Sequence, residues 1–192
     1  HNQIYLSNRA KSSDEFVRDE SENSGCGPGS CPGDVAGGQS MIREALLYEK
    51  LTDSRVHCAL CAHRCKINPG RRGLCGVREN KDGVLYTLVF GTLIAEYVDP
   101  IEKKPFFHVY PASRSYSVAT VGCNFRCEFC QNADISQMPS TMIMIGGQEV
   151  DPETIVRQAQ KYDCRTIAYT YTEPTVYLET ALAIAGIASN EG

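Results

Sequence analysis

The sequence predicts a parallel α/β fold in the C-terminal part of the chain, preceded by a small cysteine-rich cap. The first observation is an alternation of elements: residues 115–122 and 166–174 have strand patterns, and residues 151–164 and 175–189 have helix patterns. Strand followed by helix, twice over, is typical of a parallel sheet with right-handed crossovers. The second observation is a count of ten cysteines, most of them in tight clusters. Two strand–helix units cannot close a barrel, which takes roughly 250 residues, so we expect the N-terminal part of a larger enzyme.

Composition and charge exclude several classes of protein. The chain has 192 residues, and 42% of them are hydrophobic, which is enough for a folded core. Its net charge is −4 and no run of Lys or Arg exceeds two residues, which argues against a nucleic-acid footprint and a basic membrane-binding patch. No stretch approaches the roughly 18 apolar residues of a membrane span, and the first residues lack the apolar core of a signal peptide. We therefore expect neither nucleic acid nor membrane as a partner.

The composition changes along the chain and divides it into three parts. Residues 1–40 are polar and rich in Gly and Pro. Their two cysteines, Cys26 and Cys31, are interpreted as incidental thiols of a linker, with a functional pair as the alternative. Residues 41–112 are expected to hold a helix, the cysteine-rich cap and short strands. Residues 113–192 hold the two strand–helix units.

Local signals predict the elements of the middle part. Ser40 can cap a helix in which Ala45, Tyr48 and Leu51 share one side. The aliphatic and β-branched segments within 83–98 are expected to form short strands.

The helix after the first strand of the α/β part has the clearest boundary. Asp151 is expected to cap it, and Pro152 to occupy its first position. The second strand is expected to run as far as Pro174. Each helix has one apolar face, formed by Ile155, Ala159 and Tyr162 in the first helix and by Tyr177, Ala181 and Ile184 in the second.

The cysteines are spaced for a shared metal rather than for disulfides. Seven of them fall into one group at 58–75 and another at 123–130, with gaps of two or three residues except for the nine residues between Cys65 and Cys75. Such spacing suits thiolate ligands of a metal better than loop-closing bridges. Metal-binding thiols persist in a reducing compartment, so the expected location is the cytoplasm.

The second group contains three cysteines, Cys123, Cys127 and Cys130, directly after the first predicted strand. Three thiolates can hold three irons of a [4Fe–4S] cluster and leave the fourth iron open for a ligand that is not protein. Parallel α/β folds bind their ligands at this end of the strands. The alternative is a zinc loop that takes a distant fourth ligand, such as Cys164 or His108.

The stretch "CNFRCEFC" resembles the cysteine signature of radical S-adenosylmethionine (radical SAM) enzymes, which also tend to carry an aromatic residue where Phe129 stands. The resemblance implies a partial (β/α)6 barrel and an open iron that binds the amino and carboxylate groups of S-adenosylmethionine. It also implies an oxidoreductase-type reaction in which a 5′-deoxyadenosyl radical abstracts a hydrogen atom. The cofactors carry this chemistry, and the protein positions them.

The end of the second strand, "YTYTEP", resembles the glycine-rich motif with which such enzymes hold the cofactor's amino group. Glu173 and Pro174 fit that motif, whereas Tyr171 and Thr172 stand in place of its two glycines. The resemblance implies that Phe129, Thr172 and Glu173 contact S-adenosylmethionine, and a carboxylate can accept from an ammonium group. The alternative is that Glu173 only opens the next helix, where an acidic residue is favourable.

Several motifs together narrow the resemblance to the radical SAM enzymes of the AmmeMemoRadiSam group, relatives of pyruvate formate-lyase activating enzymes. These motifs lie at 58–80, 99–111, 121–136 and the "YTYTEP" segment. The resemblance implies an electron donor such as flavodoxin or ferredoxin, and it allows a protein substrate. Two alternatives stay open: an activase that makes a glycyl radical on a partner protein, and a non-catalytic iron–sulfur or zinc module.

The first group, Cys58, Cys61, Cys65 and Cys75, offers four thiolates of its own. Four cysteines can close a zinc site or hold an auxiliary iron–sulfur cluster, and the spacing does not decide between them. Four unliganded thiols in a small cap are the remaining alternative. With four thiolates available, His63 is interpreted as a neighbour rather than a ligand.

Overall fold

The computed structural model describes residues 42–142 and 144–191. By its contacts the chain divides into two units, His1–Gly38 and Gln39–Gly192, and the second holds all described residues. The predicted linker with Cys26 and Cys31, and the proposed helix cap Ser40, lie outside the described residues.

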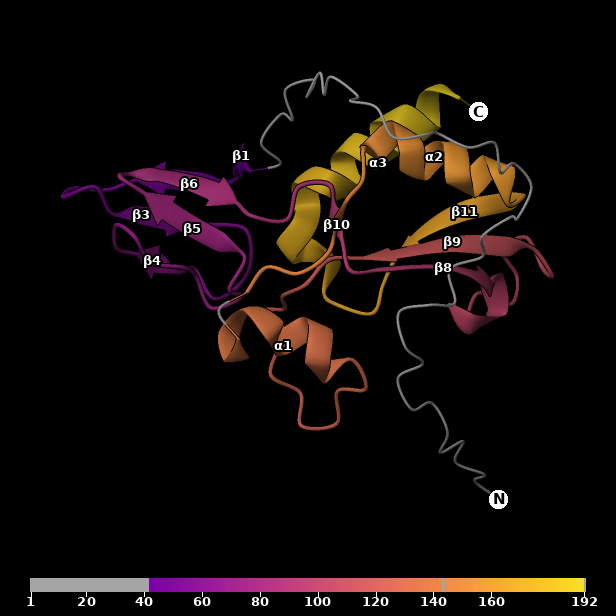
Figure 1. Ribbon diagram of the computed structural model, residues 1–192, viewed down its shortest axis with the longest axis horizontal. Helices are drawn as coiled ribbons and strands as arrows, with labels where there is room; N and C mark the ends of the chain where they lie inside the picture. The colour runs from indigo at the N-terminus through magenta and orange to yellow at the C-terminus, as the bar shows by residue number, and fades with distance from the viewer. Residues whose placement is uncertain (1–41, 143, 192) are drawn as a thin grey trace, which may run out of the picture. The chain divides into compact units, whose positions relative to one another are not determined.

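The cysteine-rich part consists of two small antiparallel sheets. One has the order β1-β6-β5 and the other the order β2-β3-β4 (Figure 1). Their strands are β1 (Arg43–Glu44), β6 (Val84–Thr87), β5 (Arg78–Lys81), β2 (Tyr48–Lys50), β3 (Val56–Cys58) and β4 (Lys66–Ile67). Val56, Ile67 and Leu85 are buried between the sheets with Cys58. The strands predicted within 83–98 are present.

The helix predicted after Ser40 is wrong: this segment forms β1 and β2 instead. Leu47 has a positive φ of 56°, which interrupts any helix between them. Tyr48 pairs with Cys58, and Arg43 pairs with Thr87. The apolar side chains at three-residue spacing therefore contribute to the core of the cysteine-rich cap and not to a helix face. Pairing with strands that are distant in sequence overrides the local helical pattern.

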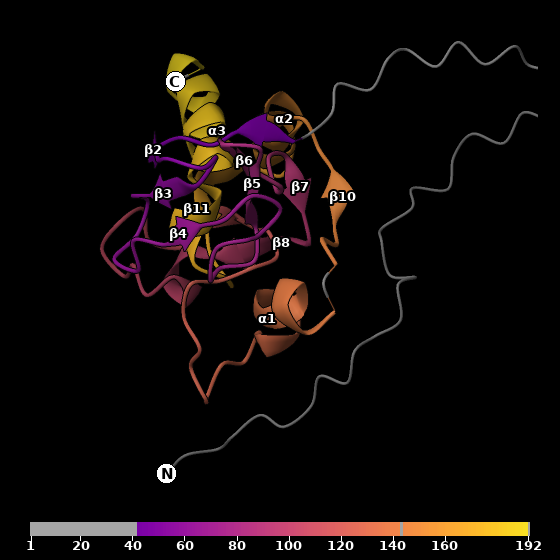
Figure 2. The same ribbon diagram turned by 90° about the vertical axis from the view of Figure 1, so that its left-hand side faces the viewer.

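The α/β part is built on a sheet in the order β11-β9-β8, with β9 (Arg114–Ala119) in the centre. β11 (Cys164–Tyr169) runs parallel to β9, as predicted, with Tyr169 opposite Val118. β8 (Ala95–Pro100) is antiparallel to β9 and makes the sheet mixed. The short strands β7 (Thr92–Leu93) and β10 (Gln148–Glu149) pair with each other nearby (Figure 2). An unpredicted helix, α1 (Ala133–Thr141), follows the three-cysteine loop.

Two helices cover one face of this sheet (Figure 1). In α2 (Pro152–Lys161), the Asp151 side chain accepts a hydrogen bond from the backbone N–H of Glu153, as the predicted cap requires. The second helix is α3 (Leu178–Asn190), and it starts from a 3-10 turn, η2 (Pro174–Tyr177). β11 ends at Tyr169 and not at Pro174, because Tyr171 turns the chain with a φ of +63°.

The two faces of the sheet differ in character. Val118 of β9 is buried against Ile155 and Ile184 of the helices. Ser115 and Ser117 alternate with it and so point to the opposite face. That face continues onto the 3-10 turn η1 (Ile101–Lys103) after β8. No helix in the described ranges is long and apolar enough to cross a membrane.

Candidate functional site

The three-cysteine loop leaves the carboxyl end of β9, as the sequence predicted. Cys123 is buried, Cys130 is half-buried and Cys127 is exposed. The Cys123 sulfur accepts a hydrogen bond from the backbone N–H of Phe125 at 3.4 Å, and the N–H of Cys130 donates to the Cys127 carbonyl at 3.2 Å. All three are free thiols in the structure. The loop therefore presents three unbridged donors at the ligand-binding end of the strand.

The structure does not hold these thiols in a finished metal geometry. In residues 42–142 and 144–191, no three His, Cys, Asp or Glu side chains are arranged to hold a metal ion. The donor chemistry fits a [4Fe–4S] cluster, since three thiols share one short loop.

A zinc loop completed by Cys164 or His108 has no support in the geometry. Cys164 pairs with Arg114 at the start of β9, whereas Cys123 follows the end of that strand. The intervening length of six residues corresponds to roughly 17 Å. His108 lies on the connection that leads into the same starting end of β9. Both proposed ligands thus lie at the wrong end of the sheet.

The cap holds the loop in place. The guanidinium group of Arg126 donates to the carbonyls of Cys123 and Leu74, at 3.1 and 2.8 Å. On the other side, the His63 ring nitrogen Nε2 lies 2.8 Å from the Asn124 carbonyl oxygen. These bonds join each side of the loop to the part of the cap that carries the first cysteine group.

Gly122 allows the cap to approach this closely. Its φ is +93°, and a Cβ at this position would lie 2.5 Å from Cγ1 of Val77 and 2.9 Å from the Cys75 carbonyl oxygen. Only glycine fits both the backbone conformation and the space. The loop that carries the three thiols is thus fixed to the cap by its first residue.

The turn after β11 lies beside the three-cysteine loop. The Asn132 side chain donates to the Tyr171 carbonyl at 3.0 Å, and the Thr172 hydroxyl donates to the Thr120 carbonyl at 2.9 Å. Tyr171 has a left-handed φ of +63°, a conformation that glycine adopts without cost and that other residues adopt at about 1–2 kcal/mol. The residue that replaces the first glycine of the motif therefore still takes a glycine-like backbone.

The Glu173 carboxylate is engaged within its own turn. Its Oε1 accepts a hydrogen bond from the Thr175 backbone N–H at 3.4 Å and another from the Thr175 hydroxyl. Glu173 thereby caps η2, which is the structural role weighed for it from the sequence. Thr172 is buried, and the Phe129 side chain is 87% exposed. These three residues lie at the predicted end of the sheet.

Asp99 organises a network that the sequence did not predict. Its carboxylate accepts hydrogen bonds from four side chains, those of Lys103, Lys104, Ser117 and Tyr171. Burial alone would raise the pKa of Asp99, but the two ammonium groups and two hydroxyls outweigh it and hold the pKa well below its usual value. The only sequence signal was the motif at 99–111, and it did not indicate which side chains would bind Asp99.

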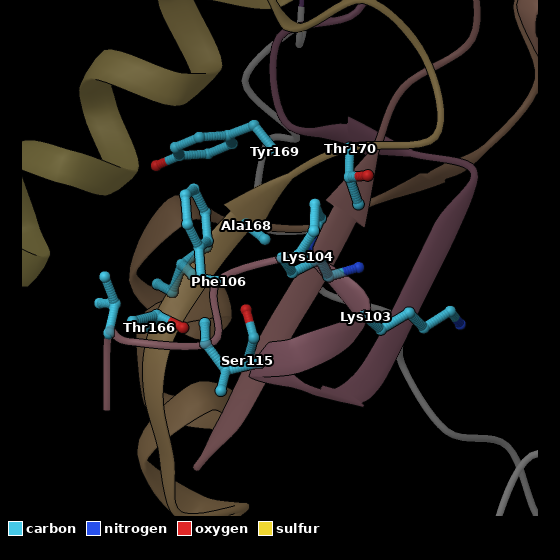
Figure 3. Close-up of a pocket in the computed structure, with 12 residues that line it drawn as sticks. Lys103, Lys104, Phe106, Ser115, Thr166, Ala168, Tyr169 and Thr170 are labelled. Carbon is cyan, nitrogen blue, oxygen red and sulfur yellow. The ribbon is translucent and has the colours of Figure 1, made fainter. Parts of the chain in front are cut away.

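A pocket of about 520 Å³ lies along β11 and is lined by residues 166–170, by Ser115 of β9, and by η1 with the segment that follows it. Figure 3 shows the rings of Phe106 and Tyr169 on one side of it and the amino groups of Lys103 and Lys104 on the other. None of the cysteines from Cys58 onward lines it, and Thr170 connects it to the turn at Tyr171. The pocket is therefore a neighbour of the three-cysteine loop and not its thiol site.

The four upstream cysteines are brought together. Cys58, Cys61, Cys65 and Cys75 all line one small cavity, together with His63, Arg78 and Asn124. Burial raises the pKa of the Cys75 thiol to about 11. All four are free thiols.

Comparison with known proteins agrees with this geometry. Residues 117–192 match the model of the Radical SAM superfamily. The matched range contains the second half of β9, the three-cysteine loop, β11 and both covering helices. The narrower AmmeMemoRadiSam resemblance stays a prediction.

Two curated relatives come from Methanocaldococcus jannaschii. The uncharacterized protein MJ0808 is 49% identical over 151 residues, which cover 79% of this chain and 45% of the relative. The uncharacterized protein MJ0674 is 29% identical over 133 residues, covering 66% of this chain and 33% of the relative. The chain thus spans less than half the length of either relative. No solved structure matches.

Proposed function

We propose that this chain carries the cofactor-binding start of a radical SAM enzyme. The observation that carries the proposal is an open set of three thiols, Cys123, Cys127 and Cys130, at the carboxyl end of β9 inside a domain of the Radical SAM superfamily. In this proposal β9 and β11 begin a partial (β/α)6 barrel, and the face with Ser115 and Ser117 becomes its interior. The reaction and the substrate depend on the whole enzyme, and they too are part of this proposal.

The three thiolates would hold three irons of a [4Fe–4S] cluster, and S-adenosylmethionine would take the fourth. When bound, the pair supplies one-electron cleavage of a carbon–sulfur bond and hence an organic radical that abstracts hydrogen, with a flavodoxin or ferredoxin as reductant. The chain's own contribution is to position the loop and the turn. Arg126 and His63 fix the loop against the cap, and Asn132 fixes the turn at Tyr171 relative to it.

The turn after β11 is proposed to receive the methionine end of the cofactor. Thr172 holds the turn against β9, and Tyr171 takes the left-handed backbone that glycine adopts freely. The Tyr171 hydroxyl is bound to Asp99 at 2.6 Å, which fixes the turn from the other side. Glu173 would then accept from the ammonium group, exchanging its bond to Thr175.

Reconstitution tests the proposal directly. The chain is incubated without oxygen with iron and sulfide, reduced, and measured by low-temperature EPR before and after addition of S-adenosylmethionine. We expect a reduced [4Fe–4S] signal whose shape changes with the cofactor, because the cofactor binds an iron. A signal that S-adenosylmethionine leaves unchanged would contradict the proposal and favour a non-catalytic iron–sulfur module.

The substitution Glu173→Gln separates the two roles of this residue. If Glu173 holds the ammonium group, the change removes a charge-assisted hydrogen bond worth roughly 1.5–3 kcal/mol. Affinity for S-adenosylmethionine should then fall by about ten- to a hundredfold, measured by equilibrium binding to the reconstituted chain. The matched control is Glu153→Gln, since Glu153 is also an acid at a helix start but belongs to α2. Unchanged affinity with a lowered melting temperature would leave Glu173 only as a cap of η2.

A further inference from the structure

The four cysteines of the cap come together although they come from two separate stretches. Cys58 and Cys65 face each other in the β3–β4 hairpin, where the Cys58 N–H donates to the Cys65 carbonyl at 2.9 Å. Cys61 lies in the turn between them, where the Arg64 N–H donates to its carbonyl. Cys75 returns from the following turn and completes the lining of the same cavity. Four thiols on one cavity are the ligand set of a closed metal site, although the side chains are not yet turned into its geometry.

Two polar atoms beside the cavity have no partner in the described part of the chain. Oδ1 of Asn124 and Nε of Arg78 are both buried and make no hydrogen bond there. Both residues line the cavity, and each is more than nine-tenths buried. The Arg78 guanidinium also lies 4.0 Å from the Cys58 sulfur. The Arg78 guanidinium is a donor that can stabilise a thiolate at Cys58, and the thiolate is the form in which cysteine binds a metal.

The size of the cavity favours a single ion over a larger group as the species that binds there. Its volume is about 10 Å³, close to the space of one water-sized sphere. A single ion fits there, whereas an iron–sulfur cluster of several atoms would have to spread the cap. Soft thiolate ligands in fourfold number select zinc among the common single ions.

We propose that Cys58, Cys61, Cys65 and Cys75 bind one Zn²⁺ ion in the cap. Four S–H bonds break, four protons pass to solvent and four Zn–S bonds form, with no change of oxidation state. The thiol side chains turn inward to make these bonds, which requires rotation within the cap and no exchange of its strands. Asn124 lies between Cys123 and Cys127 and also lines this cavity, so the zinc site borders the three-cysteine loop.

The zinc site stands independently of the proposed radical chemistry, because the two groups of thiols share no residue. The test uses the chain purified without added iron, loaded with Zn²⁺ or with Co²⁺ as a coloured substitute. We expect about one zinc ion per chain by metal analysis, and a cobalt spectrum with the charge-transfer bands of tetrahedral thiolate coordination. The cobalt spectrum of the parent chain needs no variant and so does not depend on the folding of one.

Substitution locates the ion. Cys58→Ser and Cys75→Ser should each lower bound zinc to near none, whereas the controls Cys127→Ser and Cys164→Ser should keep it. A parent chain that binds no zinc, or a loss of zinc in Cys127→Ser, would overturn the proposal. So would a [4Fe–4S] cluster reconstituted in a variant in which Cys123, Cys127 and Cys130 are all alanine, since the cap thiols would then hold a cluster.

Discussion

Alanine in place of Cys123, Cys127 or Cys130 is expected to abolish the cofactor-responsive cluster in each of the three variants. Removing one thiol leaves two protein ligands for a cluster that already has one open iron. The loop offers no replacement, because Cys164 lies at the opposite end of β9. Iron and acid-labile sulfide analysis after reconstitution measures the loss, and EPR with S-adenosylmethionine measures the response.

The control for these variants is Cys164→Ala, which removes a thiol from the same sheet without touching the loop. It should keep iron, sulfide and the response to the cofactor at the level of the parent chain. A normal response in any of the three loop variants would refute the assignment of the loop. Unaltered zinc content in the same samples would show that the cap had folded.

The α/β part could be predicted from sequence where local signals and tertiary packing agree. Asp151 and Pro152 mark the start of α2 by cap chemistry that acts within one turn. The apolar positions Ile155 and Ile184 face the sheet as their helical spacing requires. The parallel pairing of β9 with β11 follows from the order of elements alone.

Local signals failed where distant contacts decide. The segment 43–50 has a helical spacing of apolar residues but pairs as strands with β3 and β6. α1 contains Pro139 and has no side-chain cap, so its sequence lacks the usual signs of a helix. Pro139 packs closely against Gly76 of the cap, a contact that no window of sequence shows.

The candidate site likewise has features that the sequence predicted and features that it did not. Cysteine spacing indicated the candidate donors, because ligands of one metal are constrained to short loops. The Asp99 network was hidden, because Asp99 and Tyr171 are 72 positions apart and meet only through the sheet. The left-handed Tyr171 was hidden too, since a tyrosine there gives no hint of a glycine-like backbone.

The largest expected effect on stability concerns the buried ion pair between Arg78 of β5 and Glu179 of α3. Their side chains are 1% and 3% exposed. The same groups hold the backbone of Leu46, whose N–H donates to Glu179 at 2.7 Å and whose carbonyl accepts from Arg78 at 2.8 Å. The pair therefore joins the cap to the helix that covers the α/β sheet.

Removing one partner leaves the charge of the other buried in the interior without an opposite charge beside it. We expect Glu179→Leu or Arg78→Met alone to lower the free energy of unfolding by about 3–5 kcal/mol. For a chain of this length that corresponds to a fall in melting temperature of roughly 6–20 °C. Removing Arg157, whose ion pair with Glu153 is exposed, should cost at most about 1 kcal/mol and is the control.

The double variant distinguishes the cost of an orphaned charge from the value of the pair itself. With Arg78→Met and Glu179→Leu together, no buried charge is left, and apolar side chains of similar volume fill the space. The double variant should then be more stable than either single variant, even though it lacks both charges. Urea unfolding of the four chains gives the coupling energy. If the double variant were instead as unstable as the sum of the singles, the pair would act through its bonds to Leu46 and not through burial of charge.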